Sequence, residues 1–336
     1  MLIGWAAMIL RIQNAAVVVI ILATGLLLTV RAAQQAEELE VLQLRPNFYM
    51  IAGAGGNIGV QVGVDGVVVV DAGSASKAEQ VVAAIKKITN QPIRYVINTS
   101  ADPDHVGGNE KVAKAGQTLF TNLTGRGLAE NFQGGGASIL AVENVLIRMG
   151  APGGRGASFP TEALPTETFS QARKYMYLNG EGIEVLSQPA AHSDGDAIVF
   201  FRRSDVIVAG DVLDIDRFPV IDVAKGGSIQ GEIAALQKLV DTAIPSVPIV
   251  SREEGTLIIP GHGRVCDQLD VVEYRDMVTI IRDRIRDLIK QGLTLDQIKA
   301  TSPTRGYTRR YGSDTGPWTT NQFVEAVYRS LVQKPQ

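Results

Sequence analysis

The most informative stretch of this 336-residue chain is Asn98-Thr-Ser-Ala-Asp-Pro-Asp-His-Val-Gly-Gly-Asn109. It sets Asp102, Asp104 and His105 within four residues, directly after an apolar run at 93–98 and before a helical pattern. A loop at the carboxyl end of a buried strand can turn several side chains toward one point, and α/β proteins place ligand sites there. A polar turn with a proline and an aspartate helix cap is the alternative interpretation.

Three more polar residues stand beside other strand-like runs. They are His192 in Gln-Pro-Ala-Ala-His-Ser-Asp, Asp211 after Val-Ala-Gly, and His262 in Ile-Pro-Gly-His-Gly. All three histidines of the chain therefore fall on loops next to predicted strands, together with several acids. A site with four or more protein ligands must then include carboxylates, because the histidines are only three.

The patterning predicts one α/β domain without internal repeats. Strand-like runs occur at 48–52, 58–62, 66–71, 93–98, 118–121, 197–201, 206–209 and 256–259. Helical spacing occurs at 76–89, 228–243 and 267–291, and capping-box patterns at Thr294 and Thr319 predict two later helices. The glycine- and proline-rich segment 133–166 predicts a long loop.

Composition excludes several classes of protein. Hydrophobic residues make up 45% of the chain and charged residues 20%, which excludes a disordered or fibrous protein. The balance of 32 Lys and Arg against 35 Asp and Glu leaves no basic field for nucleic acid, so a small molecule is the expected partner. The single cysteine, Cys266, excludes an intramolecular disulfide and a cysteine-rich zinc module.

The N-terminus predicts export. An uncharged apolar run at 15–30 lies between Arg11 and Arg31 and precedes the small residues Ala32 and Ala33. Residues 1–32 are therefore expected to be a signal peptide of a periplasmic or secreted protein. An uncleaved N-terminal anchor is the alternative, and it is the one case that involves a membrane.

The order of these motifs resembles the metallo-β-lactamase superfamily. The family signature T-H-x-H-x-D-H-x-G-G matches Thr99, Asp104, His105, Gly107 and Gly108, and its later elements match His192, Asp211 and His262. The run Gly-Val-Val-Val-Val-Asp71 resembles the family's early strand, whose acid supports the ligand loop from behind. The resemblance implies a four-layer αββα sandwich over residues 45–291, with a metal site at one edge of the sheets and a helical extension, 292–336, packed on the same domain.

The sequence departs from the family at Ser100 and Asp102, which stand where the first two histidines normally lie. The resemblance implies one metal ion at Asp104, His105 and His262, another at Asp102 and His192, and Asp211 between them. Ser100 is a weak ligand and is expected to hydrogen-bond behind the ligands instead. One or two divalent ions are expected, with zinc preferred and manganese or iron as alternatives suited to the extra carboxylates.

The resemblance implies a hydrolase that uses a metal-activated water on a small ester, thioester or lactam, with Asp104 orienting the water and accepting its proton. Arg217, Phe218 and Lys225 follow the bridging acid and are candidate substrate contacts, unless they simply form a surface loop. Two alternatives stay open. One is a di-iron redox enzyme of the same fold, and the other is a non-catalytic metal- or ligand-binding module with a degenerate site.

Overall fold

Two β-sheets that face each other carry the fold of this computed structural model, which describes residues 38–119, 135–151, 159–246 and 255–333. The chain divides into two compact units, Met1–Glu40 and Val41–Gln336, and all elements from β2 onward belong to the second. The expected signal peptide lies outside the described residues.

The first sheet has seven strands within the described residues. In their order across the sheet they are β1 (Glu40–Arg45), β2 (Phe48–Ala52), β3 (Ile58–Gly63), β4 (Gly66–Val70), β5 (Ile93–Ile97), β6 (Ser138–Val142) and β7 (Glu167–Phe169). Strands β2 to β4 pair antiparallel, whereas β4 to β7 run parallel. Every residue of β4 is buried, as expected for a parallel strand covered on both faces.

The second sheet has five strands in the same part of the chain. Its order is β12 (Leu257–His262), β11 (Val206–Asp214), β10 (Asp196–Phe201), β9 (Glu181–Gln188) and β8 (Arg173–Leu178). Only the β11–β12 pair is parallel, and its register shifts twice between Val208 and Asp214. That irregularity lies where the polar residues of β11 begin.

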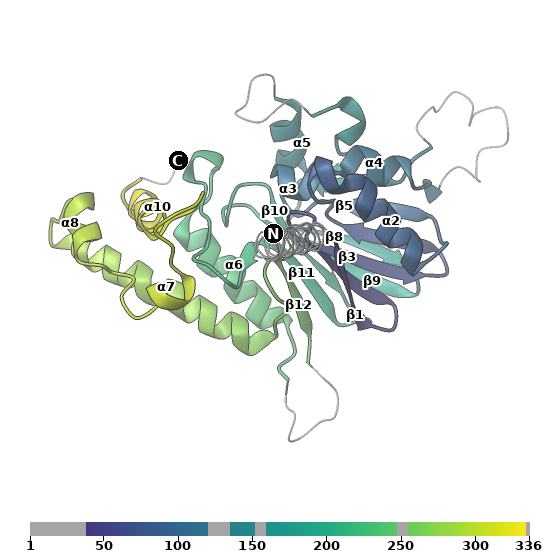
Figure 1. The fold of residues 1–336 in the computed structure, drawn as a ribbon. Helices are drawn as coiled ribbons and strands as arrows, with labels where there is room; N and C mark the ends of the chain where they lie inside the picture. The colour runs from purple at the N-terminus through teal and green to yellow at the C-terminus, as the bar shows by residue number, and fades with distance from the viewer. Residues whose placement is uncertain (1–37, 120–134, 152–158, 247–254, 334–336) are drawn as a thin grey trace, which may run out of the picture. The chain divides into compact units, whose positions relative to one another are not determined.

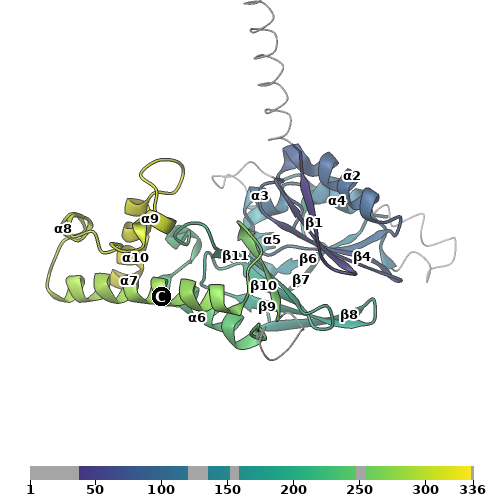
Figure 2. The same ribbon diagram turned by 60° about the horizontal axis from the view of Figure 1, so that its bottom comes forward.

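Helices cover the outer face of each sheet (Figures 1 and 2). On the first sheet lie α2 (Ala78–Ile88), α3 (Pro103–Val106), α4 (Asn109–Lys114) and α5 (Glu143–Gly150). On the second lie α6 (Ile229–Thr242) and α7 (Gln268–Lys290), followed by α8 (Leu295–Ala300), α9 (Thr308–Tyr311) and α10 (Thr320–Val332). The order of layers confirms the predicted αββα sandwich, and the capping boxes at Thr294 and Thr319 are both formed.

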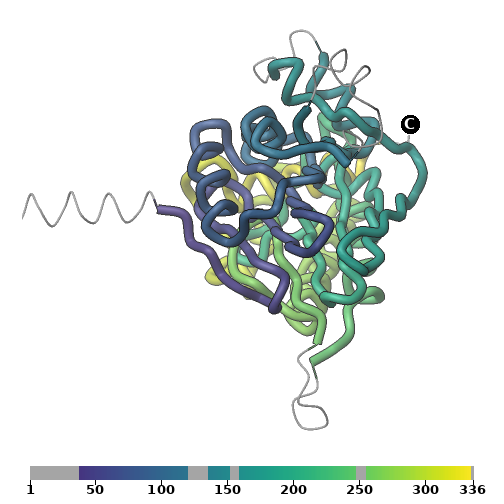
Figure 3. Tube along the Cα trace, turned by 90° about the vertical axis from the view of Figure 1, so that its right-hand side faces the viewer, coloured from purple at the N-terminus to yellow at the C-terminus, as the bar shows by residue number. Residues whose placement is uncertain are grey.

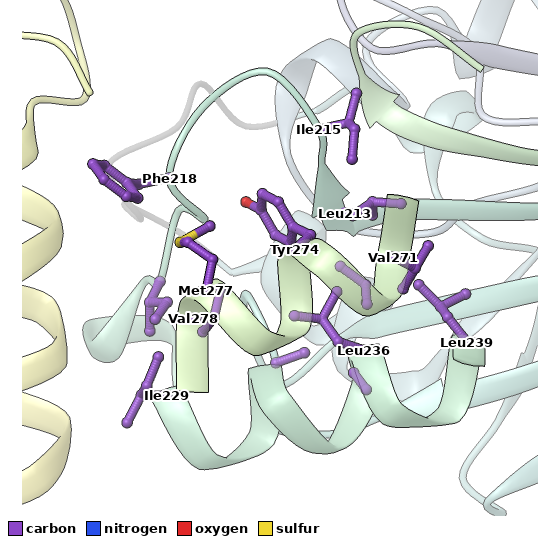
Figure 4. Packing of buried hydrophobic residues seen from close by; sticks show 14 of the residues in the cluster. Leu213, Ile215, Phe218, Ile229, Leu236, Leu239, Val271, Tyr274, Met277 and Val278 are labelled. Atoms are coloured by element: carbon purple, nitrogen blue, oxygen red, sulfur yellow. The ribbon is translucent and has the colours of Figure 1, made fainter. Parts of the chain in front are cut away.

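Two hydrophobic clusters hold these layers together. Between the sheets, Phe48 of β2 meets Phe201 of β10 edge-on, with ring centroids 4.8 Å apart. In Figure 3 the purple and blue N-terminal part of the described chain lies in front of green and yellow segments from its later part. The other cluster joins the second sheet to α6 and α7, and Figure 4 shows Tyr274, Met277 and Val278 of α7 within it.

Two sequence predictions fail in the middle of the chain. Thr118 is not in a strand, and residues from 120 to 121 lie outside the described part. The expected long loop at 133–166 instead contains β6 and α5, because the apolar run Ser138–Val142 pairs with β5 inside the sheet. The glycines and prolines on either side of this short strand led to the prediction of a loop. No helix among the described residues has both the length and the apolar character needed to cross a membrane.

Candidate metal centre

The strand ends at one edge of the sandwich bring the predicted ligands together. Asp102 and Asp104 lie on the turn into α3 after β5, and His192 lies between β9 and β10. Asp211 lies in β11, and His262 ends β12. Loops that are far apart in sequence therefore converge on Asp211.

Asp104, His105 and His262 form the first group. One ligand atom from each lies within 4.8 Å of the others. The Nε2 atom of His262 is 3.1 Å from Asp104 Oδ2. His105 is completely buried, and its Nε2 atom lies 3.0 Å from Asp211 Oδ1 without forming a hydrogen bond. A buried ring nitrogen without a hydrogen bond, aimed at carboxylates, is the donor expected of a cation site.

Asp71 orients His105 from behind. Its Oδ2 atom lies 2.8 Å from His105 Nδ1, which leaves Nε2 to face the centre. Thr99 donates to the same carboxylate through its backbone N–H at 2.8 Å and its hydroxyl at 2.6 Å. Asp71 has a positive φ of 65°, a conformation that Asp and Asn tolerate better than most residues. This arrangement fits a carboxylate–histidine–metal triad.

Asp102, His192 and Asp211 form the second group, again with ligand atoms within 4.8 Å of one another. His192 Nδ1 lies 2.9 Å from the carbonyl oxygen of Val220, and its Nε2 atom lies 3.1 Å from Asp102 Oδ2. Ser100 donates to Asp211 Oδ2 at 2.8 Å, so its hydroxyl holds the acid that both groups approach.

The charges of the centre shift the pKa values of its own members. Burial lowers the pKa of His192, but the charge of Asp211 and the hydrogen bond to Asp102 outweigh burial and raise it to about 10. Burial likewise raises the pKa of Asp102, but the hydrogen bond and charge of His192 bring it down to about 2. Close opposite charges thus dominate over desolvation in this cluster.

The three candidate substrate contacts have different surroundings. Lys225 does not project away from the centre, because its ammonium lies 2.6 Å from Asp102 Oδ1. Arg217 forms an ion pair with Asp214 and is partly exposed. Phe218 is 1% exposed and stacks on Phe323 with ring centroids 4.7 Å apart. The expectation for Phe218 is thereby corrected, since the C-terminal helix α10 covers it and makes it part of the core.

Sequence reasoning missed the loop between β2 and β3. An ideal Cβ on Gly56 would come within 2.7 Å of His105 Nε2, so only glycine leaves that imidazole its position. Next to it, the Asn57 amide donates to the carbonyl oxygens of Pro260 and Gly263 at 2.9 Å each. These bonds hold the backbone on both sides of His262. The run Ala-Gly-Ala-Gly-Gly-Asn at 52–57 was the available signal.

Comparison with known proteins agrees with this geometry. The family profile described as "Metallo-beta-lactamase superfamily" matches residues 52–119, which contain the Gly56 loop and the Asp102–His105 turn. A "Linear primary-alkylsulfatase" from Pseudomonas sp. (strain ATCC 19151) is 23% identical over 278 residues, covering 73% of this chain. This chain spans 50% of the length of that curated relative.

Solved structures show the same fold. A "Metallo-beta-lactamase from Pontibacter korlensis" superposes with a TM-score of 0.52 and 17% identity, covering 72% of this chain and 99% of its own. The stereoselective inverting sec-alkylsulfatase Pisa1 from Pseudomonas sp. superposes with a TM-score of 0.62 and 15% identity, covering 88% of this chain and 50% of its own.

Proposed function

We propose that this chain is a metal-dependent hydrolase of a small ester, thioester or lactam, because residues 52–119 match the metallo-β-lactamase superfamily profile and the fold is that of metallo-β-lactamases. One observation carries the proposal: His105 Nε2 is buried without a hydrogen bond and faces Asp211 at 3.0 Å, while Asp71 holds the other ring nitrogen. An imidazole oriented in this way presents Nε2 to the centre as a metal ligand.

We assign Asp104, His105, His262 and Asp211 to hold one divalent ion. Asp102, His192 and Asp211 are the second group of possible ligands. Zinc is the proposed ion, with manganese or iron as alternatives, because carboxylates and imidazoles together suit all three. A bound divalent ion supplies Lewis acidity, which lowers the pKa of a coordinated water to about 7.

The exposure of the side chains defines the side from which substrate approaches. His105 and His192 are sealed, with 0% and 4% of their side chains exposed. Asp104 and His262 are 37% and 26% exposed, so they line the open side. Asp104 is therefore placed to orient the attacking water and to take its proton. Burial raises the pKa of Asp104, but the hydrogen bond from His262 and the charge of His105 lower it overall, which keeps the carboxylate ionised at neutral pH.

Among esters, we propose alkyl sulfate esters as the first substrates to test. The curated relative is named a linear primary-alkylsulfatase, although it is distant and twice as long as the shared region. The ammonium of Lys225 beside Asp102 offers a positive group for an anionic substrate. The proposed binding partner is thus a small molecule and not a nucleic acid.

The experiment is a substrate screen on the purified chain loaded separately with zinc, manganese or iron. Alkyl sulfates, carboxylic esters, thioesters and lactams are each tested against the metal-free protein and a His105→Ala variant. We expect metal-dependent hydrolysis of one class that His105→Ala lacks. Metal binding without hydrolysis of any class would contradict the hydrolase and leave a binding module. Oxygen consumption by the iron-loaded protein would instead favour a redox enzyme.

We also propose export, on the apolar run at 15–30 followed by Ala32 and Ala33. Expression with a C-terminal tag, followed by N-terminal sequencing of the periplasmic and secreted fractions, tests it. A mature start near residue 33 supports a cleaved signal. An intact N-terminus in the membrane fraction supports an anchor, and an intact N-terminus in the cytosol contradicts export.

A further inference from the structure

We propose that Lys225 takes the place of one of the family's two metal ions, so that the centre holds a single divalent cation, at Asp104, His105, His262 and Asp211. The ammonium of Lys225 is then the fixed positive charge of the other half of the centre. This inference deepens the proposed function and rests on the metal binding that the function requires.

The contacts of Lys225 place its charge inside the second group of ligands. Its Nζ atom lies 2.6 Å from Asp102 Oδ1 and 3.3 Å from Asp222 Oδ2. Asp102 is one of the three residues whose ligand atoms define that group. One of its two carboxylate oxygens is therefore already taken by a cation that belongs to the chain.

The backbone of Lys225 is anchored on both sides, which fixes where the ammonium can reach. Its N–H donates to the Asp222 side chain, which caps a single 3₁₀ turn at Val223–Lys225. Its carbonyl oxygen accepts from the Arg148 guanidinium at 2.6 Å and from the Asp194 backbone N–H at 2.9 Å. A lysine held in this way differs from a surface lysine that swings freely.

The ammonium of Lys225 disfavours a second ion. It already offsets part of the negative charge of Asp102, so the second ligand group attracts a cation less than its carboxylates alone would. A divalent cation at that group would also lie beside the ammonium, where like charges repel. The residue at position 100 also disfavours a second ion. Ser100 donates its hydroxyl hydrogen to Asp211 and offers no anionic or imidazole ligand.

The same ammonium can also meet the substrate. Lysine has three N–H donors, and the two acids occupy two of them. With 35% of the side chain exposed, the third donor is available for an anionic oxygen of an ester that approaches from the open side. Lys225 would then contribute the charge stabilisation that a second metal provides in a two-metal site.

Metal stoichiometry tests the inference directly. Wild-type protein, Lys225→Met and Lys174→Met are each loaded with zinc, freed of excess ion, and measured by elemental mass spectrometry. Lys174 is a matched control, because it is 34% exposed and pairs with Glu167 at 2.7 Å, far from the centre on β8. We expect about one equivalent per chain in wild type and Lys174→Met, and about two in Lys225→Met.

Each other outcome is decisive. Two equivalents in wild type, or no gain in Lys225→Met, would overturn the role of Lys225 and leave the hydrolase proposal standing. No zinc in any protein would overturn both. If Lys225→Met fails to fold, the electron paramagnetic resonance spectrum of the manganese-loaded wild-type protein tests the inference instead. The spectrum of an isolated Mn²⁺ ion would support it, and the spectrum of two magnetically coupled Mn²⁺ ions would contradict it.

Discussion

Oδ2 of Asp71 lies 2.8 Å from Nδ1 of His105, and both side chains are buried. The acid directly follows β4 and the imidazole belongs to α3, so one contact joins the early strand to the ligand turn. Because the carboxylate accepts the Nδ1 proton, it selects the tautomer in which Nε2 is free to bind a metal ion.

Asp71→Asn should weaken metal binding by roughly 10- to 100-fold without removing a ligand. The amide can still accept from the Thr99 N–H, but its NH2 group then faces His105 Nδ1 and forces the proton to Nε2. Asparagine tolerates the positive φ of 65° at this position, so the backbone stays unstrained. Competitive zinc titration against a chromophoric chelator measures the effect. Wild-type affinity in a folded Asp71→Asn protein would refute the triad.

Gly56→Ala should also weaken metal binding, roughly tenfold, through a steric effect alone. The new methyl group would lie 2.6 Å from Cε1 of His105 and must push the imidazole away from the centre. Gly150→Ala is the control, because nothing lies within 4 Å of its ideal Cβ. Isothermal titration of zinc into both variants compares them. Equal zinc affinities of Gly56→Ala and Gly150→Ala would show that the His105 imidazole can accommodate the new methyl group without leaving the centre.

Asp104→Asn should lower kcat by about 10²- to 10⁴-fold if Asp104 takes the proton of the attacking water. An amide keeps the shape of the side chain but is not basic. Asp216→Asn is the control, because Asp216 is an exposed acid on the loop after β11 and belongs to neither ligand group. Steady-state kinetics at equal metal content separates catalysis from binding. An unchanged kcat in Asp104→Asn would remove Asp104 from the mechanism.

Metal-free protein should lose stability as pH rises from 6.5 toward 10. The pKa of His192 is raised to about 10 from 6.5, so its stabilising charge is fully present below pH 6.5 and is lost as pH passes through the folded value. His105 shifts in the same direction, because Asp211 and Asp71 outweigh its burial. A bound ion must displace these protons, so zinc affinity should rise over the same range.

Thermal melting in chelator at several pH values checks the first part of this prediction, and proton release during zinc titration checks the second. A melting temperature that rises with pH above 6.5 would contradict the sign. Zinc binding without proton release would show that the imidazoles are already neutral in the metal-free centre.

The local parts of the fold and centre could be predicted from sequence. The turn from Asp102 to His105 is one short segment between a strand and a helix, and its geometry depends on neighbours in the chain. His192 and His262 could be placed beside strand ends in the same way, whereas Asp211 lies inside β11, which continues to Asp214 beyond the strand expected at 206–209. Their convergence on one edge followed from the resemblance to a known fold.

The contacts between distant segments could not be predicted in this way. Lys225 is 123 positions from Asp102, and nothing near either residue specifies their ion pair. Phe218 was predicted to contact substrate because the sequence of its loop does not reveal that Phe323 stacks on it. The glycine-rich run at 52–57 marks a loop but does not give Gly56 its role, because that role is to leave space, and only the position of the His105 ring shows which space is needed.

That stacking of Phe218 on Phe323 connects the last helix to the centre. Phe218 N–H donates to the Tyr311 carbonyl oxygen at 3.0 Å, and two residues later the Val220 carbonyl oxygen accepts from His192. A change of side-chain volume at position 323 would therefore pass along the loop to the orientation of an imidazole. Among the described residues, α8 to α10 contribute no ligand to either group, yet Tyr311 and Phe323 pack against Phe218 of the loop that leads to Val220. We therefore expect substitutions that repack these helices to change the reactivity of the centre while every ligand stays in place.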